Sequence, residues 1–267
     1  MDKEDILRLA KDSRFISGIY NYCDRWCERC IFTSRCLNYA MSEEDEDDSI
    51  AHDLNNKAFW DKLHKIFQQT KEMIIELAKE KGIDLNSADI ESASREIDSK
   101  TDNAENHELS QTALEYAKMV DKWFGTEYPI FERKQEDLNT MLELGIDGTA
   151  PHVEANSINN AIEIIRWYQH QIYVKLMRAL TQEDFAEEIE SDTTLQKDSD
   201  GSVKVALIGM DRSIAAWGRL QACFPEKMES ILDILLHLGR LQRKTEQVFP
   251  NARSFRRPGF DDRNNPL

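Results

Sequence analysis

The sequence predicts an all-α protein, built as an antiparallel bundle of four to five long helices with an N-terminal cysteine-bearing helical segment. Two observations predict this fold class. Only ten glycines and six prolines interrupt the 267 residues, and most long segments repeat apolar residues at intervals of three and four, the spacing of one helix face. With 40% hydrophobic residues, the chain also holds enough apolar material to bury a core.

Each predicted helix carries one apolar stripe, and the clearest spans residues 55–82. Gly82 stands where a left-handed C-terminal cap is expected. In the second helix, 109–145, the stripe keeps its phase across Pro129, so we expect a kinked helix or two stacked helices there rather than a domain boundary. The first stripe consists of Phe59, Leu63, Ile66, Phe67, Ile74 and Leu77.

Three further helices are predicted at 154–180, 203–224 and 225–248. The opening of the fourth helix, 203–208, also fits a buried strand, but its apolar residues keep helical spacing for about six turns. Small residues share one face of that helix with Asp211 and would let a neighbouring helix approach closely. They are Ala215, Gly218 and Ala222. Because a one-sided helix buries its stripe against other helices, a bundle is the economical packing.

Polar, mostly acidic segments separate the helices, at 42–53, 84–108 and 182–202. Residues 43–48 are all acidic, a run that predicts a mobile, solvated loop. The C-terminal tail holds arginines, and it either stays loose or lies along the acidic body. The predicted organisation is a cysteine-bearing segment at 1–41, a helical bundle at 55–249 and a Pro/Arg-containing tail at 250–267.

The net charge limits the partners that the chain can bind. It holds 34 Lys and Arg against 50 Asp and Glu, a formal charge of −16, which repels phosphate backbones and anionic lipid surfaces. We therefore expect neither duplex nucleic acid nor a membrane as partner, and a protein that docks on the connectors should be basic. Since the sequence lacks a long apolar span and a signal-peptide pattern, we expect a cytoplasmic protein.

Four of the five cysteines fall within fourteen residues, and this cluster is the strongest functional signal. Cys23, Cys27, Cys30 and Cys36 form the pattern C-x3-C-x2-C-x5-C, which predicts that the four thiols bind one metal centre. In a reducing compartment disulfides are the poorer explanation. The alternatives are buried cysteines acting as small apolar residues, or redox-active thiols. Cys223 stands alone on an apolar helix and is predicted to bind no metal.

The predicted cofactor is an iron–sulfur cluster or zinc, depending on whether the backbone stays helical. Cys23, Cys27 and Cys30 lie at i, i+4 and i+7, on one face of a continuous helix, which would hold the outer α-carbons roughly 10 Å apart. A single zinc holds each thiolate about 2.3 Å from the metal, so the sulfurs must lie closer together than a straight helix easily allows. A broken helix therefore predicts zinc, and a continuous helix predicts a cluster with Cys36 as the fourth ligand.

Three arginines interleave with the cysteines. Positive charge there lowers the pKa of neighbouring thiols and offsets the charge of a four-thiolate site. The alternative is that the arginines, with Asp24 and Glu28, form the solvent face of an amphipathic helix. These arginines are Arg25, Arg29 and Arg35.

Two short resemblances concern the same cysteines. The segment from Cys27 to Cys36 resembles the C-x2-C-x5-C end of the iron–sulfur staple in the RecB-like nuclease family, where an aromatic residue also follows the second cysteine. Cys23, Cys27 and Cys30 are similar to the C-x3-C-x2-C motif of radical S-adenosylmethionine enzymes. The chain lacks the strand patterns of both families. The resemblances therefore imply an iron–sulfur cluster, slightly favoured over zinc. They do not imply the activity of either family.

Three function classes stay open, and the sequence does not decide whether the protein is an enzyme. The first is redox chemistry or electron transfer through a cluster, and the second is a protein-interaction module with a structural zinc. The third is a carboxylate-site bundle enzyme, for which a di-iron centre needs two Glu-x-x-His motifs. The candidate carboxylate–histidine groups are Asp61 with His64, Glu163 with His170, and Asp233 with His237 and Arg240.

Overall fold

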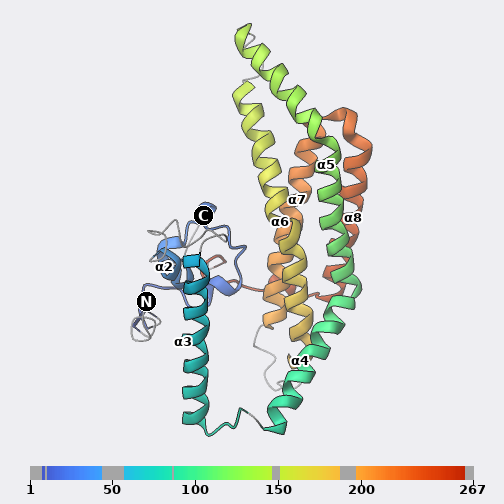
Figure 1. The fold of residues 1–267 in the computed structure, drawn as a ribbon. Helices are drawn as coiled ribbons and strands as arrows, with labels where there is room; N and C mark the ends of the chain where they lie inside the picture. Colours follow the sequence, from blue (N-terminus) through green and yellow to red (C-terminus); the bar gives the residue numbers. More distant parts are fainter. Residues whose placement is uncertain are drawn as a thin grey trace. The chain divides into compact units, whose positions relative to one another are not determined.

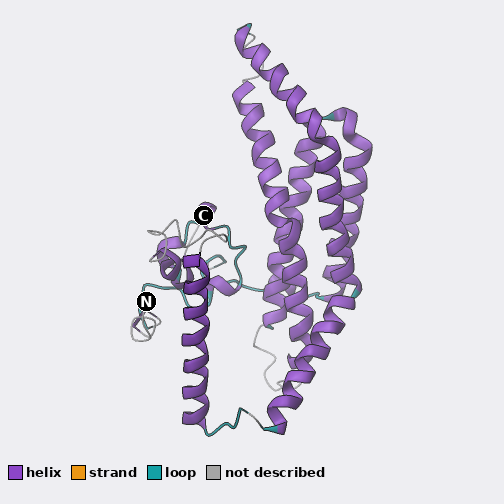
Figure 2. Cartoon of the chain, viewed as in Figure 1, coloured by secondary structure: helices purple, strands orange, loops and turns teal. Residues whose placement is uncertain are grey.

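A computed structural model of the chain describes residues 8–9, 11–43, 57–85, 87–145, 151–186 and 197–261. These residues form α-helices and short 3-10 helices and contain no strand (Figures 1 and 2). The predicted all-α class is confirmed. In the described residues the α-helices are α2 (Leu37–Glu43), α3 (Lys57–Lys81), α4 (Ala88–Asn106), α5 (Glu108–Glu143), α6 (Pro151–Ala186), α7 (Asp198–Cys223) and α8 (Met228–Val248).

The chain divides into two compact units. Unit 1 comprises Met1–Tyr20, Arg25–Lys100 and Pro258–Leu267, and unit 2 comprises Asn21–Asp24 and Thr101–Arg257. Both units are thus built from segments far apart in the sequence. The short segment Asn21–Asp24, which contains Cys23, belongs with the long helices of unit 2.

The long helices α5–α8 pack against one another in unit 2. Helices α5 and α7 each contact both α6 and α8, and the four lie side by side in Figure 1. The one-sided stripes predicted for these helices point into a shared core, in which Trp217 is fully buried. Its ring meets Trp123 edge-on at 5.0 Å and lies 5.8 Å from Phe124. Aromatic contacts of this kind add about 0.5–1.5 kcal/mol each beyond the burial of apolar area.

Two predicted helices are confirmed with bounds close to those expected. Helix α5 continues through Pro129 without a boundary. The segment that also fitted a buried strand, 203–208, is helical, because α7 begins at Asp198 and all its early turns are buried against neighbouring elements. Continuous burial makes an uninterrupted apolar run compatible with either a strand or a core helix, and only the tertiary packing decides.

The prediction of a polar connector at 84–108 is wrong, because Ala88–Asn106 form helix α4. The Ser87 hydroxyl accepts a hydrogen bond from the Ile90 N–H at 3.4 Å at the start of α4, and Glu96 pairs with Lys100 at 2.7 Å one turn apart. Local capping and i,i+4 pairs of this kind stabilise a helix of polar composition. Polarity alone was therefore a poor sign of a loop. The first connector is outside the described residues from position 44 onward, as are residues 187–196 of the third.

The apolar stripe of α3 is exposed where the structure describes its side chains. Phe67 is 65% exposed, Ile74 53% and Leu77 56%. The expected burial of this stripe is therefore not observed for these residues. The side chains of Phe59, Leu63 and Ile66 lie outside the described part of the chain.

The small-residue face predicted on α7 is not a close helix contact. Ala215 and Ala222 are exposed, and an added Cβ at Gly218 would meet nothing within 4 Å. The tight positions on α7 are Gly201 and Gly209 instead. At Gly209 an added Cβ would lie 2.8 Å from the Tyr168 ring of α6, so this glycine allows α6 and α7 to approach.

Unit 1 contains a small apolar core beneath the cysteine-bearing turns. Ile19 and Phe32 are buried, and the Phe32 ring meets Phe260 edge-on at 4.9 Å. Gly259 adopts a positive φ of 76°, and a Cβ there would lie 2.9 Å from the Ile16 side chain. The C-terminal residues 258–260 therefore pack on the segment that carries Cys27, Cys30 and Cys36.

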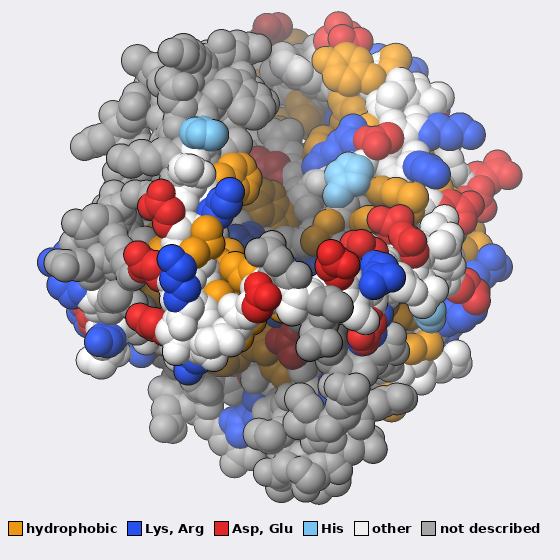
Figure 3. All heavy atoms as spheres, turned by 60° about the horizontal axis from the view of Figure 1, so that its bottom comes forward, with side chains coloured by type: hydrophobic (Ala, Val, Ile, Leu, Met, Phe, Trp, Pro, Cys, Tyr) orange, Lys and Arg blue, Asp and Glu red, His pale blue; other side chains and the backbone are white. Residues whose placement is uncertain are grey.

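The charges on one face of the described surface are mixed in sign. On the face shown in Figure 3, Asp and Glu side chains are interspersed with Lys and Arg rather than gathered into one patch. Among the described residues, no helix is both long enough and apolar enough to cross a lipid bilayer.

Candidate metal centre

The four clustered cysteines lie on turns and not on a continuous helix. Cys27 opens a 3-10 helix, Cys27–Arg29, and Cys30 follows it in an extended conformation (φ −91°, ψ 127°). Cys36 likewise follows the 3-10 helix Thr33–Arg35 with φ −110° and ψ 114°. Between Cys23 and Cys27, Arg25 has a positive φ of 55°. The sequence left two alternatives open for this segment, a continuous helix and a broken one. The continuous helix, with Cys23, Cys27 and Cys30 on one face, is not observed.

A backbone amide points at one of the clustered sulfurs. The Phe32 N–H donates to the Cys30 Sγ at 3.4 Å, and Phe32 itself is buried, so its ring holds this amide in place. All five cysteines are thiols and half-buried. No group of three His, Cys, Asp or Glu side chains in the described residues is arranged to hold a metal ion.

The three interleaved arginines lie on the surface of the cysteine segment. Arg25, Arg29 and Arg35 are exposed, and the Arg29 guanidinium lies 4.1 Å from the centre of the Trp26 ring. This stacking is a cation–π contact of about 0.5–1 kcal/mol at an exposed site. They face solvent, as the second of the two predicted roles requires, but they lie on turns and 3-10 helices and not on an amphipathic helix.

Cys23 lies within a segment that we call the strap, residues Asn21–Asp24, and the strap is fastened to α6 through its backbone. The Asn21 carbonyl accepts hydrogen bonds from Arg178 at 2.9 Å and from Lys175 at 3.5 Å. The Asp24 carbonyl accepts from the Trp167 Nε1–H at 3.0 Å and from the Gln171 amide. The main chain is therefore held on both sides of Cys23.

The Asp24 side chain joins the strap to both α6 and α7. Its Oδ2 accepts from the Tyr168 hydroxyl and, at 2.8 Å, from the Arg212 guanidinium. Arg212 also donates to the Tyr168 oxygen at 2.5 Å, which closes a three-residue ring of contacts. Burial, followed by the hydrogen bond and negative charge of Asp24, raises the pKa of Tyr168, so this phenol stays a donor at neutral pH.

The Tyr22 side chain makes the second attachment. Its hydroxyl donates to Asp198 Oδ1 at 2.5 Å, and Asp198 is paired with Arg178 at 2.9 Å. Burial and then the hydrogen bond to Asp198 raise the pKa of Tyr22 to about 12. The Tyr22 ring lies 4.7 Å from the Phe255 ring, and both rings cover Gly201, where a Cβ would approach Tyr22 to 2.4 Å.

Sequence reasoning missed the role of Asp24, which one of its two alternatives placed on the solvent face of a helix. Asp24 is half-buried and contacts four side chains of unit 2. A signal for this contact was present in α6, where hydrogen-bond donors recur on one side of a helix in an otherwise acidic chain. These donors are Trp167, Tyr168, Gln171, Lys175 and Arg178. A one-sided row of donors indicates a surface that receives carbonyl or carboxylate oxygens.

The carboxylate–histidine groups predicted for a bundle enzyme do not face a common interior. Glu163 and His170 are exposed, as are His64, Asp233 and Arg240. The Asp61 side chain lies outside the described residues. His237 Nε2 donates to the Thr112 carbonyl at 2.9 Å, which is a helix-to-helix contact between α8 and α5.

Cys223, predicted not to bind metal, sits at the end of α7. Burial raises the pKa of its thiol, which disfavours the thiolate form that binds metals.

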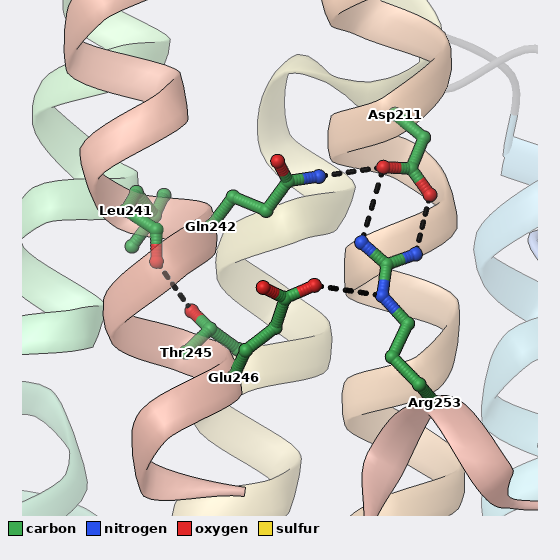
Figure 4. Close-up of polar contacts among 6 residues, drawn as sticks. All are labelled: Asp211, Leu241, Gln242, Thr245, Glu246 and Arg253. Carbon is green, nitrogen blue, oxygen red and sulfur yellow. Dashed lines mark hydrogen bonds and ion pairs between the residues drawn. The ribbon is translucent and has the colours of Figure 1, made fainter. Parts of the chain in front are cut away.

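A second polar cluster fastens the C-terminal tail to α7 and α8 (Figure 4). Arg253 binds Asp211 through two contacts of 2.5 and 3.1 Å, and it binds Glu246 at 2.8 Å. Gln242 also donates to Asp211 at 2.5 Å. Of the two predicted alternatives for the tail, this part therefore lies along the acidic body.

The comparisons with known proteins add no relative. No protein-family model matches the chain, and the searches of curated proteins and of solved structures gave no match.

Proposed function

We propose that this chain is a metal-binding protein in which Cys23, Cys27, Cys30 and Cys36 supply four thiolates to one centre, carried by an antiparallel bundle of α5–α8. The observation that carries the proposal is the segment of fourteen residues that presents four thiols on turns. The amide that donates to Cys30 supports it, because hydrogen bonds to ligand sulfurs are a common part of thiolate metal sites.

The turns favour zinc as the metal. A continuous helix would have kept the thiols too far apart for one zinc, whereas backbone turns allow a tetrahedral arrangement at about 2.3 Å from the metal. The chain between Cys23 and Cys27 spans at most about 14 Å when extended, so the segment can bring its sulfurs together. The likeness of the last three cysteines to an iron–sulfur staple supports the second candidate, an iron–sulfur cluster with redox function.

Metal binding is coupled to the conformation of the cysteine segment. Because the described thiols are not grouped around one point, a metal must draw them together and should stabilise the turns that result. A structural metal of this kind suits an interaction module. The charge of −16 makes a basic protein the favoured partner, and it disfavours duplex nucleic acid at physiological salt. A cytoplasmic location remains a prediction.

Elemental analysis of anaerobically purified protein tests the proposal. We expect one zinc per chain in colourless protein, whereas brown protein with iron and sulfide identifies the second candidate. Cys27→Ser should remove the metal, and Cys223→Ser is the matched control that should retain it. Metal-free wild-type protein, or loss of metal only in Cys223→Ser, would show that the four-cysteine assignment is wrong.

Salt dependence tests the proposed basic partner. If residues 43–48 attract such a partner, deleting them should slow association and reduce its dependence on salt, since fields are screened beyond about 8–10 Å at physiological ionic strength. An unchanged association rate after deletion would show that this run only keeps the protein in solution.

A further inference from the structure

The side of α8 opposite its buried residues is apolar at its centre. Leu232 is 45% exposed and Leu236 is 47% exposed, and residues four apart lie one above the other on a helix. Helix α8 packs on α5 and α7. Its buried residues lie on the opposite side, at Ile231, Ile234, Leu238, Leu241 and Thr245. The core of the bundle therefore does not account for the two leucines.

Charged residues surround these leucines, and the two signs are separated along the helix. The exposed carboxylates are Glu229 and Asp233, and the exposed arginines that follow are Arg240 and Arg243. At 3.6 residues per turn, all four lie within about 60° of the direction of Leu236. The helix dipole favours basic residues in the last turn, but both arginines lie before the last turn of α8. The dipole therefore does not explain them.

We propose that this face is a contact between two copies of the chain, in which their α8 helices pack antiparallel about a two-fold axis at Leu236. A two-fold contact must be complementary to itself. Opposite such an axis, Glu229 of one copy meets Arg243 of the second copy, and Asp233 meets Arg240. A parallel pair would place each residue beside its own copy and so bring like charges together. The proposal does not depend on the metal centre proposed above.

A glycine on the same face leaves room for the second copy. An added Cβ at Gly239 would meet nothing within 4 Å, so packing within the chain does not require glycine there. Glycine inside a helix costs about 1 kcal/mol relative to alanine. In the antiparallel pair, Leu232 of one copy lies opposite Gly239 of the other, on the same side of the face. The contact between copies therefore gives a reason for this glycine.

The dimer should be weak, because the contact runs along one helix. Interfaces below about 1,200 Å² are typical of transient complexes. Exposed ion pairs contribute little to affinity, so the leucines should supply most of it, while the charges fix the antiparallel direction. We expect mainly monomer at about 1 µM and mainly dimer at about 300 µM.

Sedimentation velocity of the full-length chain over that range tests the proposal, with reductant present because the cysteines are thiols. Leu236→Glu places two carboxylates face to face and should raise the dissociation constant by about 30-fold or more, as for a central residue of an interface. Circular dichroism checks that this variant stays folded. Phe67→Glu changes an exposed apolar residue of α3 instead and should leave the dimer unchanged.

Three outcomes of this experiment would overturn the proposal. The first is a wild-type chain that stays monomeric over the whole range. The second is a dimer that survives Leu236→Glu, and the third is a dimer lost in Phe67→Glu, since either result would place the contact on another surface.

Reversing the charges tests the antiparallel pairing. Glu229→Arg sets two arginines against each other, twice in a two-fold dimer, and should raise the dissociation constant by about 10-fold. The double variant with Arg243→Glu exchanges the two charges and should return the constant close to that of wild type. A double variant that dimerises no better than Glu229→Arg would contradict this pairing and overturn the proposal.

Gly239→Gln tests the close approach of the two helices. Its Cβ meets open space within the chain, so the thermal midpoint of dilute protein should not fall. In the dimer the side chain competes with Leu232 of the second copy and should raise the dissociation constant by about 10-fold. Gly218→Gln is the matched control, because nothing lies within 4 Å of its added Cβ either. Equal dimerisation of wild type and Gly239→Gln would overturn the proposal.

Discussion

Helices α3 and α7 have nearly equal lengths, 25 and 26 residues, and opposite burial. Both carry apolar residues at helical spacing. In α7, Trp217 and Leu207 are fully buried, whereas Phe67 on α3 is 65% exposed. The difference shows that an apolar stripe identifies a helix and the face that it offers, but not whether another element covers that face.

Replacing the central tryptophan of α7 should have the largest effect on the stability of the fold. Trp217→Ala removes a fully buried ring that contacts Trp123 and Phe124, and we expect a loss of about 3–5 kcal/mol in the free energy of unfolding. Phe67→Ala should change it by less than about 0.5 kcal/mol. Urea unfolding followed by circular dichroism measures both.

The Phe67 variant tests directly whether the apolar stripe of α3 is exposed to solvent. If Phe67→Ala costs as much as Trp217→Ala, the stripe of α3 is covered in solution. The contrast between the two helices would then disappear.

The sequence predicted the long helices because local periodicity decides them. It failed at α4, where a cap at Ser87 and the pair of Glu96 with Lys100 stabilise a helix that its polar composition did not predict. It also failed at Asp24, because the partners Tyr168 and Arg212 lie 144 and 188 residues away. The row of donors on α6 indicated a surface that receives oxygens, but nothing in one sequence indicated that Asp24 supplies them, because only the fold brings residues so far apart together.

Two glycines of α7 should respond to the same substitution with opposite signs. At Gly201 an added Cβ would lie 2.4 Å from Tyr22 and 2.6 Å from Phe255, so Gly201→Ala should destabilise the fold by about 1–3 kcal/mol. At Gly218 nothing lies within 4 Å, and Gly218→Ala should stabilise it by up to about 1 kcal/mol. Thermal midpoints of the two variants measure the difference. A higher midpoint in Gly201→Ala would show that the strap does not pack on α7 as described, whereas a lower midpoint in Gly218→Ala would contradict only the open space at Gly218.

Alkaline pH should weaken unit 2 through its buried tyrosines, a residue type that α3 lacks. Burial raises the pKa of Tyr116 on α5 to about 12, from about 10 in an unfolded chain. The folded state therefore holds this proton more tightly, and the stability that it contributes is present below about pH 10 and is lost as the pH rises towards 12.

The variant Tyr116→Phe isolates that contribution. Its free energy of unfolding should fall less than that of wild type between about pH 8 and about pH 11, by roughly 1 kcal/mol. Parallel pH profiles would mean that Tyr116 is accessible to solvent. The loss of the hydrogen bond from Trp217 to the Tyr116 oxygen affects both pH values alike, so it does not alter the difference.

The smallest effect is expected at the surface pair that fastens the tail. Arg253 is 42% exposed and binds Asp211 and Glu246, and exposed ion pairs contribute about 0.2–1 kcal/mol. Arg253→Ala should therefore lower the free energy of unfolding by less than about 1 kcal/mol at low salt. The difference from wild type should shrink further at about 0.5 M NaCl, because screening weakens exposed pairs. A loss that does not change with salt would show that the ion pairs of Arg253 do not account for it. Apolar packing, as between Phe255 and Tyr22 or in the core around Trp217, would then be the force that holds the tail.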